Sequence, residues 1–167
     1  MNRSEKARRV AILCCHCARN AAYYRAGWQP NIRLKNDFWV SVNGNFLDLM
    51  ALDWCKLFTD RGGKHHWRKV APDIDGFLPG LRDAVNATSE EFDFCQAEMK
   101  TYRDKFVAHL DNEPEMKIPK LTMAIESLFY LYASVRNEYA DDLADAPATL
   151  RHYYRTRVAY GKAFYPQ

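Results

Sequence analysis

Arg103, Asp104 and His109 lie close together in the chain and are residue types that catalyse reactions at phosphate groups. Histidine titrates near neutral pH, so His109 could donate or accept a proton. The guanidinium of Arg103 is always charged and its planar fork matches a phosphate, so it could stabilise developing negative charge. Asp104 could orient either group or help to polarise a nucleophile. These three residues are the predicted catalytic set.

The spacing of Arg103 and His109 sets a geometric condition on such a site. Six residues at 100° each place the two side chains about 120° apart around an ideal α-helix, with about 9 Å of rise between them. The reach of the arginine, local unwinding near Pro114 or a second subunit could bring them together. A structural interpretation is also open, in which His109 caps the C-terminus of its helix. Arg103 would then pair with Glu98 or Asp104.

The segment around these residues resembles the signature of the HEPN superfamily (higher eukaryotes and prokaryotes nucleotide-binding). That signature is an arginine, a polar residue, three to five further residues and a histidine, near the end of a bundle helix. Arg103, Asp104 and His109 match it with four residues in between. Ala108 directly before the histidine and Asp111 two residues after it are similar to the abortive-infection branch of that superfamily.

Residues 52–58 and 66–70 also resemble that branch, so the similarity spans about residues 40–135. The resemblance implies a metal-independent endoribonuclease of the toxin or abortive-infection type. A 2′-hydroxyl would attack the adjacent phosphate, which restricts the substrate to RNA. It also implies a homodimer whose two-fold axis places two arginine–histidine sets around one cleft. Neither a metal nor a cofactor is expected.

A second class of function stays open beside the ribonuclease. The superfamily also contains catalytically silent dimeric modules, which bind RNA, a nucleotide or a protein such as a nucleotidyltransferase-type antitoxin. The intact arginine, aspartate and histidine favour the enzyme. The same antitoxin is the expected protein partner if the chain is a toxin.

Other chemistry-bearing residues have weaker functional interpretations. Cys14 and Cys17 share a helix face, but no second Cys/His pair follows at zinc-site spacing, so a metal-binding sensor is a distant third hypothesis. His65 and His66 follow a pair of glycines and are expected in a loop, with a phosphate contact as the minority option. No P-loop, dinucleotide-binding, nucleophile-elbow or His-Glu-x-x-His motif is present, so the enzyme classes built on these motifs lose their main support.

Helical periodicity dominates the chain, and no segment alternates in the manner of a strand. We expect an all-α, single-domain bundle of five to six helices over residues 1–167. Residues 73–87 are the least certain, because Gly76, Pro79 and Gly80 interrupt any regular element. Helices are expected from Ser4 as N-cap to near Gly27, from Asn36 to about Asp60, from Thr88 or Ser89 to about Leu110, from Pro119 to about Asp142, and from Pro147 to about Tyr160, with one short turn within His65–Val70.

Length and composition indicate the number of domains and the cellular compartment. The 167 residues suit one domain, and the apolar stretches are too short for a membrane span. The N-terminal residues lack the apolar run of a signal peptide, and five cysteines, three of them crowded at positions 14–17, do not suit a disulfide framework. We therefore expect a cytoplasmic protein with reduced thiols and no membrane partner.

The formal net charge of +3 is unevenly distributed. Residues 1–35 hold eight lysines and arginines against one acid, and residues 147–167 hold four against none. Residues 88–115 hold eight acids against three bases. Tyrosines are interleaved with both basic ends, a combination that holds single-stranded nucleic acid through phosphate pairing and base stacking. The alternative is a solvated helix face with its tyrosines buried on the other side.

Overall fold

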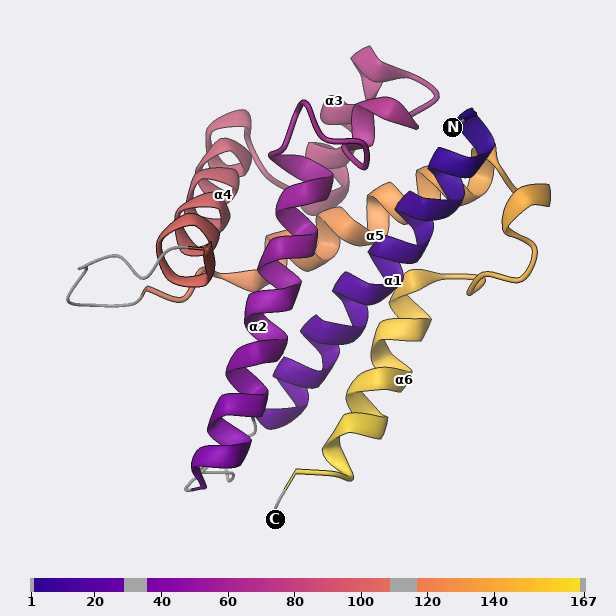
Figure 1. The fold of residues 1–167 in the computed structure, drawn as a ribbon. Helices are drawn as coiled ribbons and strands as arrows, with labels where there is room; N and C mark the ends of the chain where they lie inside the picture. The colour runs from indigo at the N-terminus through magenta and orange to yellow at the C-terminus, as the bar shows by residue number, and fades with distance from the viewer. Residues whose placement is uncertain (1, 29–35, 109–116, 166–167) are drawn as a thin grey trace.

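The computed structural model describes residues 2–28, 36–108 and 117–165, which form six α-helices, three shorter helical segments and no strand (Figure 1). This confirms the expected all-α bundle. The α-helices are α1 (Arg3–Gly27), α2 (Asp37–Phe58), α3 (Ile74–Val85), α4 (Ser89–Tyr102), α5 (Leu121–Glu138) and α6 (Leu150–Lys162). Two 3₁₀ turns, η1 (Trp67–Lys69) and η3 (Asp141–Leu143), and one π-helical segment, η2 (Arg103–Ala108), lie between them.

Helices α1 and α2 form a central pair, with α6 against α1 and α4 against α2 (Figure 1). Helix α5 packs on α1 and on α3, and so closes the bundle from a third side. Helix α1 meets its neighbours mainly through small residues, which let the helices approach closely. These are Ala7, Ala11, Cys14, Cys17, Ala18 and Ala21. None of the described helices combines the length and the apolar character that a bilayer crossing needs.

Two helix starts differ from those expected, because another residue makes the better cap. Helix α1 is capped by Asn2, whose side chain accepts from the Glu5 backbone N–H, while the Glu5 carboxylate accepts from Asn2 N. This reciprocal capping box moves the helix start before Ser4. Helix α6 begins after Thr149, whose hydroxyl accepts from His152 N, and Pro147 precedes the helix.

Helix α3 occupies the stretch that carries three helix-breaking residues. Asp73 caps it by accepting hydrogen bonds from the backbone N–H groups of Asp75 and Gly76, each at 3.0 Å. Phe77 and Leu81 point into the core and are buried. Capping and burial therefore outweigh the cost of a proline within the helix.

Substituting alanine for Asp73 is expected to lower the free energy of unfolding by about 1 kcal/mol, because two N–H groups lose their acceptor. Urea unfolding of the two proteins measures the difference. Asp75→Ala, which removes a first-turn carboxylate but no cap, is the matched control and should cost about 0.3 kcal/mol. Equal losses in the two variants would contradict the capping role of Asp73.

Candidate active site

The predicted catalytic arginine follows directly on helix α4, which is anchored to α2 at two points. The Tyr102 hydroxyl donates to Asp48 Oδ1 at 2.7 Å, and Gln96 Nε2 donates to the Phe58 carbonyl at 2.9 Å. The helix starts at Thr88, which forms a capping box with Glu91. The apolar face of α4 lies in the core through Phe92, Cys95, Met99 and Tyr102. The position of Arg103 relative to α2 is thus fixed by packing on both sides.

The chain changes its winding at Arg103. An α-helix was expected to continue to about Leu110, but α4 ends at Tyr102, and Arg103–Ala108 form the π-helical segment η2. A π-helix closes its hydrogen bonds over five residues instead of four, so 100° per residue does not hold here. The 120° separation calculated for an ideal α-helix therefore does not apply to this segment. Short π segments occur frequently at functional sites.

Arg103 is held by two carboxylates from different parts of the chain. Its Nη1 donates to Asp60 Oδ1 at 2.6 Å, and its Nε donates to Asp104 Oδ1 at 2.8 Å. Asp60 lies just beyond the C-terminal end of α2, and the arginine side chain is only 14% exposed. Burial disfavours the charged form, but the hydrogen bonds to Asp104 and Asp60 outweigh it and raise the pKa of Arg103. The guanidinium is therefore a fixed cation.

Asp104 is shared between two cations. Lys100 Nζ donates to its Oδ2 at 2.7 Å, one helical turn before it, while Arg103 occupies the other oxygen. These hydrogen bonds, that of Lys100 first, lower the pKa of Asp104, so the carboxylate stays ionised. Two bases and two acids thus form one neutral cluster of Arg103, Asp104, Asp60 and Lys100, which we call the Arg103 cluster.

One nitrogen of Arg103 is left for a ligand. Within the described part of the chain, Nε and Nη1 have carboxylate partners and Nη2 has none. Arg61 adds an exposed cation nearby, because it lines with Lys100 a shallow hollow of about 160 Å³ beside the cluster. A phosphate oxygen bound at Nη2 would leave both ion pairs in place. Two parallel hydrogen bonds from the guanidinium to one phosphate would require Asp60 or Asp104 to move away from Arg103.

The structure brings together Arg103 and Asp104 of the predicted set, and adds Asp60 and Lys100 to them. His109 lies outside the described residues. The pairing of Lys100 with Asp104 is visible in the sequence, since the two are four residues apart on a helix. Asp60 has no local signal, because it meets Arg103 only through the packing of α2 on α4. Of the two pairings in the structural interpretation of Arg103, that with Asp104 is formed, and the ion pairs of Arg103 among the described residues do not include Glu98.

The cysteine candidates are buried thiols. Cys14 and Cys17 are free and fully buried, and burial raises the pKa of both. The Cys17 thiol donates to the Met50 carbonyl at 3.4 Å. Residues 2–28, 36–108 and 117–165 contain no group of three or more side chains placed to hold a metal ion. The Cys14–Cys17 pair therefore serves the packing of α1.

His66 has a structural role at the start of η1. Its Nδ1 accepts from the Arg68 backbone N–H at 3.3 Å, and the ring lies beside Trp67. The residue is 1% exposed, and burial lowers its pKa to about 4. The imidazole is therefore neutral at physiological pH and does not present a charge to a phosphate.

The burial of His66 predicts a specific pH dependence of stability. An unfolded histidine takes up a proton below about pH 6.5, whereas folded His66 does so only near pH 4. Its contribution is fully present above pH 6.5 and is lost as the pH falls towards 4, by up to about 3 kcal/mol. Urea unfolding between pH 7 and 4 should show a shallower decline in His66→Asn, since asparagine can still cap the turn. His65→Asn should keep the wild-type decline, and identical declines in all three proteins would contradict the assignment.

Searches against protein-family models, curated proteins and solved structures find no match to this chain.

Proposed function

We propose that the chain is a metal-independent endoribonuclease of the toxin or abortive-infection type. Arg103 would bind the scissile phosphate and stabilise the charge that develops on it, and His109 would transfer a proton to or from the reacting oxygens. Asp104 would orient the guanidinium. The 2′-hydroxyl of the substrate would attack the adjacent phosphate, so the substrate would be RNA.

The observation that carries this proposal is the state of Arg103. Its guanidinium is fixed by Asp60 and Asp104, stays charged, and keeps Nη2 without a partner among the described residues. A cation held in place before the reaction costs little reorganisation when charge develops. The shallow surface beside Lys100 and Arg61 suits a long polymer better than a small enclosed substrate. Each of these features supports phosphate chemistry at this place.

The proposal includes the assembly in which the protein would work. A homodimer with its two-fold axis near η2 would place two Arg103 clusters at one cleft and add a second histidine to each. The enzyme would act in the cytoplasm and would be restrained by a partner such as a nucleotidyltransferase-type antitoxin. Unrestrained cleavage of cellular RNA requires such control.

The proposal is tested with purified protein and total RNA in excess chelator. Wild type is expected to cleave and to leave 2′,3′-cyclic phosphate ends, and His109→Ala is expected to be inactive. His65→Ala is the matched control, because it removes a half-exposed histidine that forms none of the ion pairs of the Arg103 cluster, and it should cleave as wild type. Cleavage that is unaffected by His109→Ala would contradict the assigned site.

A catalytically silent dimeric module is the second candidate. It is favoured by the neutrality of the Arg103 cluster, since two carboxylates already satisfy most of the guanidinium. An arginine of this kind can act purely as a tether between α2 and η2. Binding of the same RNA, measured beside cleavage, separates the two candidates, because RNA binding without any cleavage is expected only of the silent module.

A further inference from the structure

The two basic ends of the sequence come together in the fold. Helices α1 and α6 lie side by side, although more than a hundred residues separate them (Figure 1). The Tyr165 hydroxyl donates to the Tyr23 carbonyl at 3.0 Å, which ties the end of the chain to α1. The described lysines and arginines of α1 and α6 are thus carried by two neighbouring helices.

One face of each helix lines the seam between α1 and α6. Spacings of three and four residues, on α1 and likewise on α6 and the turn after it, place these side chains in two facing rows. We call the seam the α1–α6 groove, and its rows are Arg8, Ile12, His16, Arg19 and Tyr23 on α1 and Tyr153, Arg157, Tyr160 and Phe164 on the other side. Both rows contain arginine and aromatic side chains.

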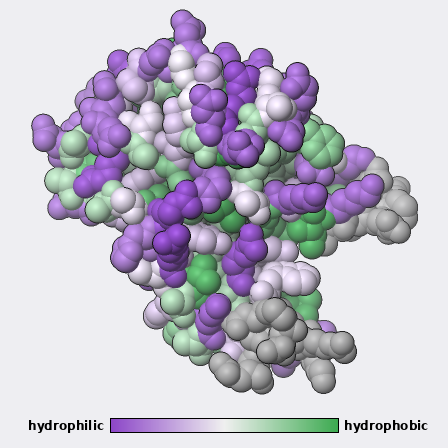
Figure 2. All heavy atoms as spheres, turned by 180° about the vertical axis from the view of Figure 1, so that it is seen from behind, coloured by the Kyte–Doolittle hydropathy of each residue, from purple (hydrophilic) through white to green (hydrophobic). Residues whose placement is uncertain are grey.

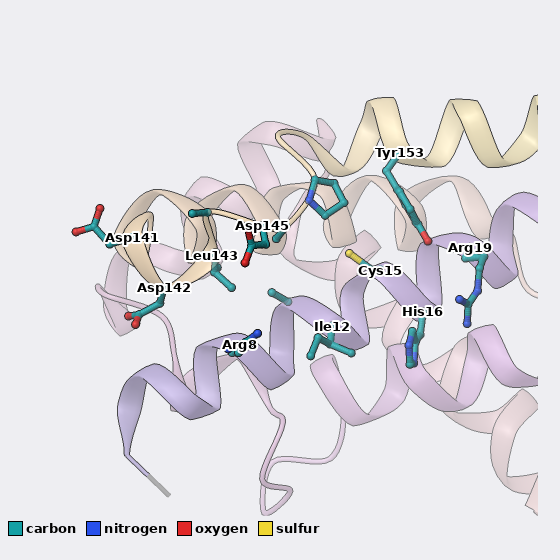
Figure 3. Close-up of a pocket in the computed structure, with 14 residues that line it drawn as sticks. Arg8, Ile12, Cys15, His16, Arg19, Asp141, Asp142, Leu143, Asp145 and Tyr153 are labelled. Carbon is teal, nitrogen blue, oxygen red and sulfur yellow. The ribbon is translucent and has the colours of Figure 1, made fainter.

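Two hollows mark the ends of the groove. The first, of about 380 Å³, lies between Arg8, His16 and Arg19 of α1 on one side and residues 141–147 together with Tyr153 of α6 on the other. Figure 3 shows the Tyr153 hydroxyl directed across this hollow towards α1. The second, of about 210 Å³, is lined almost entirely by apolar and aromatic groups, which are Tyr23, Trp39, Val42, Phe46, Tyr160, Gly161, Phe164 and Tyr165.

Arg157 lies between the two hollows and is stacked on tyrosines. Its guanidinium carbon is 5.0 Å from the centre of the Tyr153 ring and 6.0 Å from that of Tyr160. Its buried Nε has no hydrogen-bond partner. Interaction with Tyr153 first, and with Tyr23, raises the pKa of Arg157, so the guanidinium is a cation held among tyrosines.

The cations of the groove lack acidic partners. Among the described residues, Arg103 and Arg151 form ion pairs with carboxylates, whereas Arg19 and Arg157 form none. Acidic side chains line only the η3 end of the first hollow, where Figure 3 shows three aspartates, Asp141, Asp142 and Asp145. An anionic chain would be repelled at that end and attracted along Arg19 and Arg157.

Aromatic surface continues beyond the second hollow. Tyr160 is 54% exposed and Phe164 is 55% exposed, in a protein whose other aromatic rings are mostly packed. Seen from behind, hydrophobic residues reach the surface between hydrophilic ones over the narrow lower end of the molecule (Figure 2). Exposed rings beside unpaired cations are the combination that binds single strands, by base stacking and phosphate pairing. A protein partner would be expected to bring acids to this face, but it would not require exposed rings beside the cations.

We propose that the α1–α6 groove binds single-stranded RNA, with phosphates at Arg19 and Arg157 and bases stacked on Tyr160 and Phe164. The choice of RNA as the strand rests on the proposed function. Helix α6 packs on α1 and α4 packs on α2, so the groove and the Arg103 cluster lie on opposite sides of the central helix pair (Figure 1). The groove therefore holds the substrate away from the reacting phosphate, and its loss should weaken binding without changing the chemical step.

The test uses proteins that also carry His109→Ala, so that the strand is not cleaved, and measures their binding of a fluorescent oligouridylate of about ten nucleotides by anisotropy at low salt. This length is within the usual range of such sites. Arg157→Gln and Tyr160→Ala are each expected to raise the Kd about tenfold. A plot of the logarithm of the binding constant against the logarithm of the salt concentration should also be shallower in Arg157→Gln. Its slope should fall in magnitude by about 0.7, the value expected for one phosphate contact with a single strand. Lys69→Gln removes one exposed charge on η1 and is the matched control, expected to bind as wild type. Circular dichroism of each variant checks that the fold is retained.

The outcomes separate this inference from the ribonuclease proposal. Binding that is lost in the groove variants, in a protein that never cleaves, would support the groove and contradict the enzyme. Cleavage with a wild-type KM in Arg157→Gln and Tyr160→Ala would support the enzyme and overturn the groove. Equal affinity for duplex RNA would overturn the assignment to single strands. Dimerisation that is lost in Tyr160→Ala while RNA binding is kept would assign the rings to a subunit interface and overturn the inference.

Discussion

Substituting alanine for Arg103 is expected to lower the rate of RNA cleavage by about 10²–10³-fold. Removing one preorganised donor to developing negative charge has an effect of this size. The loss of stability should be only about 1 kcal/mol, because Asp60 and Asp104 are 37% and 39% exposed and water replaces the arginine. Single-turnover cleavage, normalised to the folded fraction at the assay temperature, measures the catalytic part alone.

Two further variants sharpen this prediction. Arg103→Lys keeps the charge but loses the planar fork, so a partial recovery of cleavage is expected. Lys100→Ala removes one ion pair of Asp104 and leaves both contacts of Arg103, so it should change cleavage far less. Cleavage within about threefold of wild type in Arg103→Ala would contradict the role of this arginine.

Trp54→Ala is expected to lower the free energy of unfolding by about 3–5 kcal/mol, the usual cost of removing a fully buried tryptophan. Trp54 is 0% exposed and stacks on Phe58 with ring centres 4.8 Å apart. Its Nε1 donates to the Ala124 carbonyl at 3.0 Å and to Ser127 Oγ at 3.1 Å, which joins α2 to α5. The variant would lose both the ring and the link between two helices. Urea unfolding measures the change.

Trp54→Phe separates the two contributions, since it keeps most of the ring and removes the N–H group. The Ser127 hydroxyl still donates to the Ala124 carbonyl, so the expected cost is about 1–2 kcal/mol. Phe94→Ala is the control for removing a large aromatic residue, because Phe94 is 65% exposed and its loss should cost below about 0.5 kcal/mol. A loss in Trp54→Ala no larger than that in Phe94→Ala would contradict the place of Trp54 in the core.

Most of the helices could be predicted from the sequence because their apolar residues recur every three or four positions. Helix α3 could not, since its glycines and proline are typical of a loop. Both glycines are explained by close contacts that only the fold shows. A side chain at Gly80 would clash with the Tyr130 hydroxyl, and one at Gly76 would clash with the Asp73 carboxylate. Tertiary contacts therefore override the local signals in this segment.

The end of α4 could not be predicted either. The three- and four-residue spacing of the apolar side chains of α4 continues to Phe106, past the point where the winding changes at Arg103, so periodicity does not locate the change. Of the candidate site, Arg103 and Asp104 were predictable as neighbours, while the ion pair with Asp60 depends on how α4 packs against α2. The meeting of the two basic ends likewise depends on the packing of α1 with α6.

The central claim is that RNA is cleaved by its own 2′-hydroxyl without a metal ion. The most direct measurement uses an RNA oligonucleotide that contains a mapped cut site, together with a copy that carries one 2′-deoxy substitution directly 5′ of the scissile phosphate, both in excess chelator. We expect cleavage of the all-RNA strand and none at the substituted position. Cleavage at the 2′-deoxy position, or cleavage only after a divalent metal is added, would contradict the account.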